Sequence, residues 1–225
     1  MKLKKIVKIF LLVVFVFLQI YLVFIKNFQV LDYSRYNNEY PPQPLYGKNK
    51  KTKKVSQTFR TPGPLARIDI MLANYLVKPK GGTLQLGIFK ENRCLFLKKY
   101  PANTVEDNKF YTFAIDPGKV LRGEYTLRLK HFPEDKKERL AVWIYREDIY
   151  PFGSLFVDGK QKQGDMTFRV YYLSTLWQQR DRIIEKIPPL WLSRSWIVIG
   201  FLITLLTINL LFYYFVNKLL NSLDN

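Results

Sequence analysis

The chain holds one cysteine and one histidine in 225 residues. Cys94 alone cannot form an intramolecular disulfide, so the fold must rest on its core, and its alternation with Phe96 predicts a small buried side chain. His131 alone excludes a histidine-rich metal site and leaves a Ser-His-Asp triad with a single base. Its place at the end of a predicted strand, before Phe132 and Pro133, favours a turn or rim residue over a catalytic base.

Acidic residues are also scarce, with 18 Asp+Glu against 36 Lys+Arg and a net charge of +18. Residues 26–191 hold 17 of the acids and 30 of the bases, which leaves +13 on that region. A positive field of this size attracts anionic lipids, acidic glycans or phosphate-bearing polymers. A generally basic composition without a specific ligand is the open alternative. Residues 47–54 form a lysine-rich run, which is most often a solvated linker. The alternative is that the run contacts an anionic surface, through Lys50, Lys51, Lys53 and Lys54.

The sequence contains no constellation of residues for catalysis, and no cofactor is expected. A glycine-rich phosphate loop is missing. Two adjacent acidic pairs, Glu134–Asp135 and Glu147–Asp148, would point to opposite faces of an extended segment, so neither forms an acid–base pair. Oxygen donors in predicted turns are candidates for calcium, although hydrogen bonds to the local backbone are the favoured alternative. These candidates are Asp107, Asn108 and Asp165.

Two long apolar runs bracket the chain, Ile9–Ile25 and Trp196–Val216. A membrane-spanning helix needs roughly 20 such residues. The first run is longer than the apolar core of a signal peptide and no small-residue cleavage site follows it, so an uncleaved anchor is favoured over a signal peptide. Polar residues inside the runs, including Gln19 and Asn209, either bond a neighbouring helix or are satisfied within their own helix.

The flanking charges give two conflicting indications of orientation. The lysines at positions 2, 4, 5 and 8 place the N-terminus in the cytoplasm. The basic residues ahead of the second run, from Arg180 to Arg194, favour the opposite orientation for that run alone. Because the first span usually dominates, we expect both termini in the cytoplasm and the central domain on the other side of the membrane, outside the cell. Nucleic acid is then excluded as a partner.

Between the runs, the apolar residues alternate with period two from Val55, which is typical of strands. About nine short strands with turn signals between them predict an all-β sandwich, jelly-roll-like and of about eight to nine strands, flanked by two transmembrane helices. The expected boundaries are 1–8 for a cytoplasmic basic tail, 9–25 for the first transmembrane helix, 26–54 for a tether, 55–173 for the sandwich, 174–191 for an amphipathic juxtamembrane segment, 192–216 for the second transmembrane helix and 217–225 for a cytoplasmic tail.

Aromatic side chains are the candidates for ligand binding. Flat exposed rings stack on the apolar side of a sugar, and the candidate rings are Trp143, Tyr145, Tyr150 and Phe152. Trp143 and Tyr145 alternate with Val142 and Ile144, so only one of the two sets faces solvent. The alternative, that Trp143 belongs to the core, stays open at this point.

Residues 57–172 carry a series of strand and turn motifs, namely Gln57–Phe59, Leu65–Ala73, Asp107–Phe113, Gly123–Leu127, Gly153–Phe156 and Gly164–Tyr172. Through these motifs, about half of the chain resembles the extracytoplasmic carbohydrate-binding-like jelly-roll domain of bacterial membrane proteins associated with polyprenyl-phosphate-sugar glycosyltransferases. The resemblance implies a sandwich fold and a role close to a glycan. In that family the domain can be fused to a many-span enzyme, whereas this chain has two apolar runs and no acidic catalytic loop.

We therefore expect a non-catalytic, membrane-anchored accessory protein in cell-surface polysaccharide or glycolipid assembly. The resemblance implies a location in the inner membrane of a bacterium, with a multispan membrane enzyme or a glycan as partner. The apolar runs imply the lipid bilayer as a partner, and the positive charge implies an anionic polymer. The alternative is a structural subunit or scaffold of a membrane complex, whose sandwich binds protein and no sugar.

Overall fold

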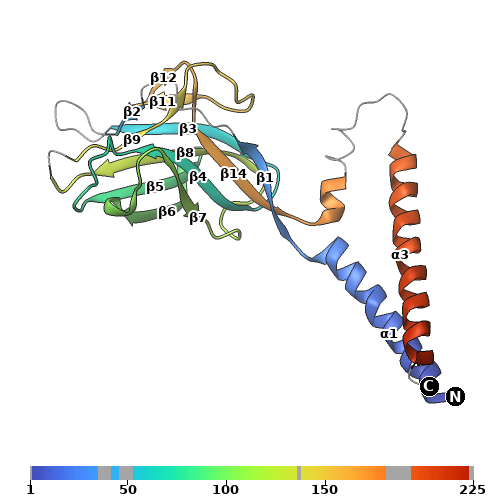
Figure 1. The fold of residues 1–225 in the computed structure, drawn as a ribbon. Coiled ribbons are helices and arrows are strands. Elements are labelled where there is room, and N and C mark those ends of the chain that lie inside the picture. Colours follow the sequence, from blue (N-terminus) through green and yellow to red (C-terminus); the bar gives the residue numbers. More distant parts are fainter. Residues whose placement is uncertain (1, 35–41, 46–52, 136–137, 181–193, 223–225) are drawn as a thin grey trace. The chain divides into compact units, whose positions relative to one another are not determined.

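The computed structural model describes residues 2–34, 42–45, 53–135, 138–180 and 194–222. The chain divides into two compact units. One consists of Met1–Phe28 and Ser174–Asn225 and holds the long helices, and the other, Gln29–Leu173, holds the β-sheets (Figure 1).

The described residues form 14 strands. Their bounds are β1 Phe28–Ser34, β2 Gln43–Pro44, β3 Lys54–Thr61, β4 Leu65–Ala73, β5 Thr83–Lys90, β6 Arg93–Pro101, β7 Lys109–Ala114, β8 Gly123–Phe132, β9 Ala141–Val142, β10 Ile144–Tyr145, β11 Leu155–Val157, β12 Lys160–Lys162, β13 Asp165–Met166 and β14 Phe168–Ser174. A short 3₁₀ turn, Ala102–Thr104, follows β6.

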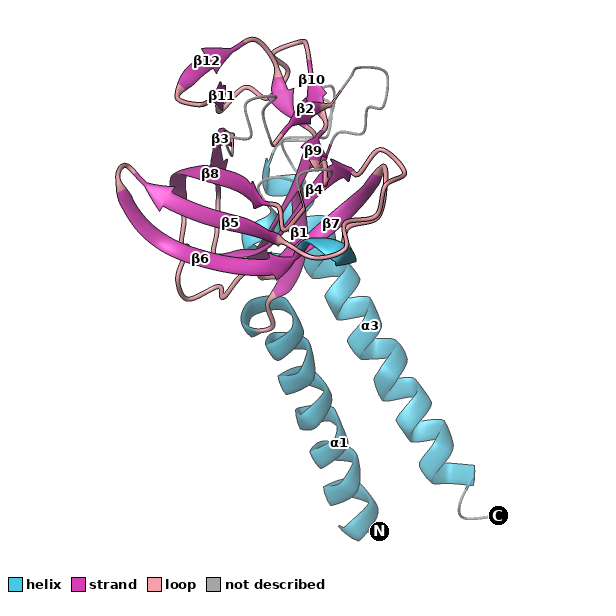
Figure 2. Ribbon diagram, turned by 90° about the vertical axis from the view of Figure 1, so that its left-hand side faces the viewer, coloured by secondary structure: helices cyan, strands magenta, loops and turns pink. Residues whose placement is uncertain are grey.

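The strands build two six-stranded sheets and one small two-stranded sheet. One large sheet has the order β1-β14-β4-β9-β2, with β7 also paired to β4, and the other has the order β12-β11-β3-β8-β5-β6. The small sheet is β10-β13. Figure 2 shows β8, β5 and β6 side by side at one edge of the second large sheet. Chain neighbours are often not sheet neighbours, so the connections repeatedly cross from one sheet to the other.

Alternation along the strands explains how the two large sheets share one core. In β8, Tyr125, Leu127 and Leu129 are buried, while the residues between them are half-buried or exposed. A single hydrophobic cluster contains these three together with residues of the other sheet, such as Ile68 and Phe168. Burying each such side chain stabilises the fold by about 1.5–3 kcal/mol. The β-rich prediction is therefore confirmed as two sheets around one core.

Three predictions about this unit are wrong. Strands β1 and β2 lie inside 26–54, the expected tether: β1 has seven residues and adds to the sheet of β4 beside β14, and β2 is a two-residue strand among the prolines that pairs with β9. His131 is fully buried, because the inward alternation of β8 continues to the residue before its end. Cys94 is exposed, because β6 is an edge strand whose pairing to β5 shifts at a bulge between Ile88 and Phe89.

The helical unit contains two long apolar helices. The first, α1 (Lys2–Ile20), continues into a π-helical turn, η1 (Tyr21–Ile25), and the last, α3, spans Arg194–Ser222. The segments Ile6–Ile25 and Leu202–Leu219 are long and apolar enough to cross a membrane, by length and composition. Residues 176–180 are helical, and the rest of the predicted juxtamembrane segment lies outside the described residues.

The two long helices pack antiparallel. The rings of Phe15 and Phe212 stack with centroids 3.9 Å apart, and Asn209 Nδ2 donates to Gln19 Oε1 at 2.9 Å. Nearer the start of α1, Lys8 Nζ donates to Asn217 Oδ1 at 3.0 Å. Early residues of α1 thus meet late residues of α3. Asn209 fits both alternatives left open for polar residues in the spans, because its Nδ2 donates to Gln19 of the other helix and to the Leu205 carbonyl of its own helix at 2.8 Å.

Candidate functional site

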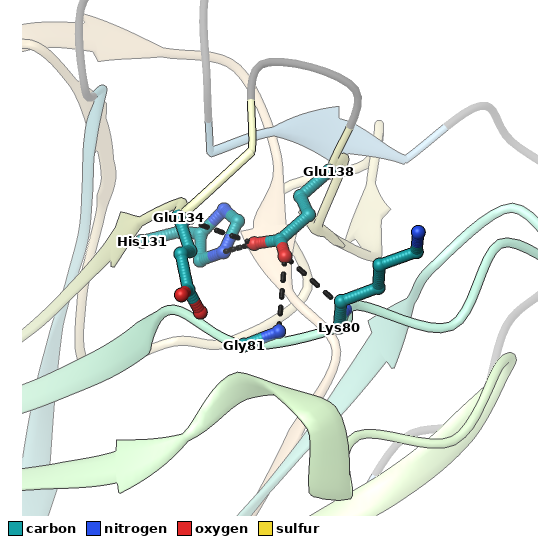
Figure 3. Close-up of polar contacts among 5 residues, drawn as sticks. All are labelled: Lys80, Gly81, His131, Glu134 and Glu138. Carbon is teal, nitrogen blue, oxygen red and sulfur yellow. Dashed lines mark hydrogen bonds and ion pairs between the residues drawn. The ribbon is translucent and has the colours of Figure 1, made fainter.

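One buried carboxylate of the β unit, that of Glu138, holds two loops together. Glu138 Oε1 accepts hydrogen bonds from the backbone amides of Lys80 at 3.1 Å and Gly81 at 3.0 Å, and Oε2 accepts from that of Glu134 at 3.1 Å (Figure 3). His131 Nε2 lies 3.9 Å from Glu138 Oε2. The carboxylate therefore ties the segment before β5 to the segment after β8, which is a structural task.

His131 is not arranged as a base. Neither of its ring nitrogens has a hydrogen-bond partner among the described residues. Burial lowers the pKa of the imidazole, against the smaller opposing effect of the Glu138 carboxylate. A neutral ring closed off from solvent has no access to a substrate proton.

The three calcium candidates are already engaged with N–H donors. Asp165 is fully buried, and its carboxylate accepts from Gln57 Nε2 at 2.9 Å and from the amides of Ile149 and Tyr150 at 2.8 and 2.7 Å. Burial raises the pKa of Asp165, although these donors oppose the shift.

The other two candidates have similar bonds. Asp107 Oδ1 accepts from the amides of Asn74 and Tyr75, and Asn108 Oδ1 accepts from Trp143 Nε1 at 3.0 Å. No group of three or more His, Cys, Asp or Glu side chains that could hold a metal ion occurs among the described residues.

The four candidate aromatic rings do not form one surface. Trp143 is only 8% exposed and packs in a small buried cluster with Met71, and Tyr150 is 2% exposed within the main core. These two rings cannot stack on a sugar in this structure, and for Trp143 the alternative of a core residue is the one observed. Tyr145 is half-buried on β10, whereas Phe152 is 53% exposed.

Phe152 is held in place by the residues on either side of it. The hydroxyl of Tyr150 accepts from the backbone amide of Arg60 at 2.9 Å and lies 3.2 Å from its carbonyl, to which it can donate. Burial raises the pKa of this hydroxyl to about 12, so it stays protonated. On the other side, the amide of Ser154 donates to Thr58 Oγ1 at 2.6 Å.

Gly153 completes this attachment of the loop to β3. A Cβ at position 153 would lie 1.8 Å from the carbonyl oxygen of Thr58, so only glycine allows the loop to approach the strand so closely. Phe152 is consequently fixed beside β3 with its ring outward. The guanidinium of Arg60 lies 5.6 Å from the ring centroid, within the range of a cation–π contact.

Beside this ring lies an open groove of about 550 Å³, a size typical of small-molecule sites. We call it the Phe152 groove. Its walls are the ends of β3, β5 and β8, and its lining residues are Thr58, Phe59, Lys90, Glu91, Glu124, Tyr125, Thr126 and Phe152. Hydroxyl, ammonium and carboxylate groups therefore surround one exposed aromatic ring.

Sequence reasoning identified Phe152 but missed the polar residues around it. The alternation of β8 already places Glu124 and Thr126 on one face, opposite Tyr125. Only the pairing of β3 with β8, which sets Thr58 opposite Thr126, shows that they share that face with β3.

Four lysines were candidates for contact with an anionic surface. Lys50 and Lys51 lie outside the described residues. The backbone amide of Lys53 donates a hydrogen bond to the Leu45 carbonyl, and Lys54 is the first residue of β3.

Comparisons with protein-family models and with curated proteins find no match to this chain.

Proposed function

We propose that the protein is a non-catalytic, membrane-anchored accessory protein whose jelly-roll-like, carbohydrate-binding-like domain binds a glycan outside the cell. In this proposal α1 and α3 are the two membrane spans, both termini are cytoplasmic, and the protein serves the assembly of a surface polysaccharide or glycolipid. The observation that carries the proposal is the Phe152 groove.

The chemistry of the groove suits a sugar. An exposed aromatic ring offers a large, rigid apolar face at small entropic cost. The groups around it are both donors and acceptors, as the many hydroxyls of a glycan require. Phe152 cannot swing away easily, because Tyr150, Gly153 and Ser154 fix its loop to β3. A fixed ring loses little freedom when it binds a ligand.

The carboxylates in the same groove favour binding of a glycan without hydrolysis of its glycosidic bonds. Two carboxylates line it, those of Glu91 and Glu124, and a glycosidase also needs two. However, both side chains are exposed to solvent, whereas the general acid of a glycosidase keeps its proton by lying in an apolar environment. The buried acids Glu138 and Asp165 are occupied by backbone amides.

The test measures binding of the full chain, in detergent micelles, to a panel of neutral and acidic oligosaccharides. Phe152→Ala should weaken binding about tenfold, the loss that corresponds to one aromatic contact at the upper end of its usual range. The matched control is Tyr75→Ala, another exposed aromatic, 44% accessible on a different loop, which should bind like the wild type.

Two results would count against glycan binding. One is that no oligosaccharide binds, and the other is that Phe152→Ala binds as well as the control. If a multispan membrane protein then co-purifies with both variants alike, the alternative of a structural subunit replaces the proposal.

A further inference from the structure

A second groove, of about 140 Å³, lies on the same sheet. We call it the basic groove. Three cationic side chains line it, Lys54 from β3 and Arg128 and Lys130 from β8. Gln85, Gly87 and Phe89 of β5 and Leu97 of β6 complete the lining, which includes no acidic residue.

The pairing of the strands brings these cations together at a cost. Lys54 lies directly opposite Lys130 in the β3–β8 pair. Like charges at such positions destabilise an antiparallel pair. Among the described residues, no carboxylate forms an ion pair with Lys54, Arg128 or Lys130. Asp158 Oδ1 accepts a bond from the backbone amide of Lys54 at 2.8 Å. An anion from outside the chain would relieve the repulsion.

Arg128 is preorganised to receive that anion. Its guanidinium lies 3.9 Å from the centroid of the Phe89 ring, so the ring fixes the plane of the guanidinium and leaves its N–H edge for a carboxylate or phosphate. Gly87 makes this possible, since a Cβ there would lie 2.6 Å from the Phe89 ring. The ring therefore folds down over the glycine and beneath the guanidinium.

The basic groove continues the Phe152 groove along β8. Glu124 and Thr126 line the one, and Arg128 and Lys130 line the other. Residues two apart on a strand share a face and lie about 7 Å apart. An extended polymer that follows β8 would contact both grooves in turn.

We propose that the basic groove binds the anionic groups, carboxylate or phosphate, of an acidic glycan whose sugar rings occupy the Phe152 groove. This inference rests on the proposed function and adds the class of ligand. A soluble polymer fits better than a bilayer surface, because the cations line a concavity. Membrane-surface segments instead present their cations around a protruding apolar face.

The experiment uses the full chain in detergent micelles and two forms of one polymer, polygalacturonate and its methyl ester. The two forms share the same sugars and differ in charge. The double variant Arg128→Gln with Lys130→Gln, called the groove variant, changes the basic groove. It should bind polygalacturonate about tenfold or more weakly than the wild type, because charge-assisted hydrogen bonds are lost. Binding of the methyl ester should not change.

The matched control removes one lysine and one arginine from the turn before β8. Lys119 and Arg122 are exposed there and line neither groove, so Lys119→Gln with Arg122→Gln should change binding less than about twofold. Lys130→Gln alone should melt at the same temperature as the wild type or higher, because it removes the repulsion between Lys54 and Lys130 and keeps the contact of Arg128 with Phe89.

The outcomes separate the two proposals. If Phe152→Ala reduces binding but the groove variant and the control bind polygalacturonate equally, the anionic ligand is wrong and the glycan-binding function stands. If neither polymer form binds but an oligosaccharide of the panel does, the acidic glycan is wrong and the glycan-binding function stands; if nothing in the panel binds either, both proposals fail. If the groove variant loses binding only to vesicles that contain anionic lipid, the acidic glycan is wrong and a membrane surface replaces it.

Discussion

At the scale of single residues, two buried carboxylates of the β unit, Glu138 and Asp165, hold loops in place through hydrogen bonds. Glu138 accepts from three backbone amides and Asp165 from two, with a further bond from Gln57. Removing such a carboxylate would leave several buried donors without a partner, each at a cost of about 1–3 kcal/mol. These residues are essential to the fold, and for that reason they are not free for chemistry.

His131 gives the clearest prediction at this scale. Burial lowers the pKa of its imidazole in the folded protein, whereas in the unfolded chain the pKa is about 6.5. Below about that pH the unfolded chain binds more protons than the folded one, so the free energy of unfolding decreases as pH falls. We expect the thermal midpoint of the full chain in detergent to decrease between about pH 7 and about pH 5.5.

The control for this prediction is His131→Leu, which cannot titrate. Asp165 contributes with the opposite sign, because its pKa is raised by burial and its protonated form favours the folded state as pH falls. The difference between wild type and variant therefore isolates the histidine, which is unique in the sequence. Equal pH dependence in the two proteins would show that the imidazole does not lose its proton on folding.

At the scale of elements, the sequence predicts best the strands that have one face in the core and the other face in solvent. The alternation of β8 predicted its start and the buried positions of Tyr125, Leu127 and Leu129, because a half-buried strand has period two, but the prediction stopped short of His131. The pattern failed for β1, whose seven residues do not alternate clearly, and for β2, which has two residues and lies among prolines. The predicted burial of Cys94 also failed, because Cys94 pairs with Phe89 at a bulge that the sequence pattern does not predict.

The candidate site shows the same limit. Phe152 could be named from its loop, but Thr58 is far away in the chain and reaches the loop through the close approach at Gly153 and the bond to the Ser154 amide. Burial of Trp143 depends likewise on Met71 and Asn108, which come from other elements. Pairing between distant segments is not contained in local periodicity, so a site built on such pairing has to be seen in the fold.

The antiparallel helix pair makes a prediction that can be tested by cross-linking. In a Cys94→Ser background, Phe15→Cys with Phe212→Cys should form a disulfide under mild oxidation, because these two side chains stack on each other. Phe17 is 66% exposed and lies on another face of α1, so Phe17→Cys with Phe212→Cys is the matched control and should not cross-link. Comparable cross-linking of both pairs would mean that α1 and α3 do not pack as described.

At the scale of the whole molecule, the helix pair bears on topology. Two antiparallel helices that both cross a membrane return the chain to the side on which it started. If both helices cross, the strand unit, which lies between them in the sequence, is on the other side. The basic residues at the start of the chain assign the start to the cytoplasm. The basic residues ahead of α3 favour the reverse, so the orientation needs a direct measurement.

Cys94 provides that measurement, because it is the only cysteine and it is exposed on β6. In intact cells whose outer layers admit small reagents, a membrane-impermeant maleimide should label Cys94 without any denaturant. The control is Cys94→Ser with Lys218→Cys, which places the thiol near the end of α3. That thiol should react only after the cell membrane is permeabilised. Labelling of position 218 with protection of Cys94 would reverse the orientation, and equal labelling of both would contradict two spans. The glycan-binding proposal depends on the first result, since a domain inside the cell would not meet a surface polysaccharide.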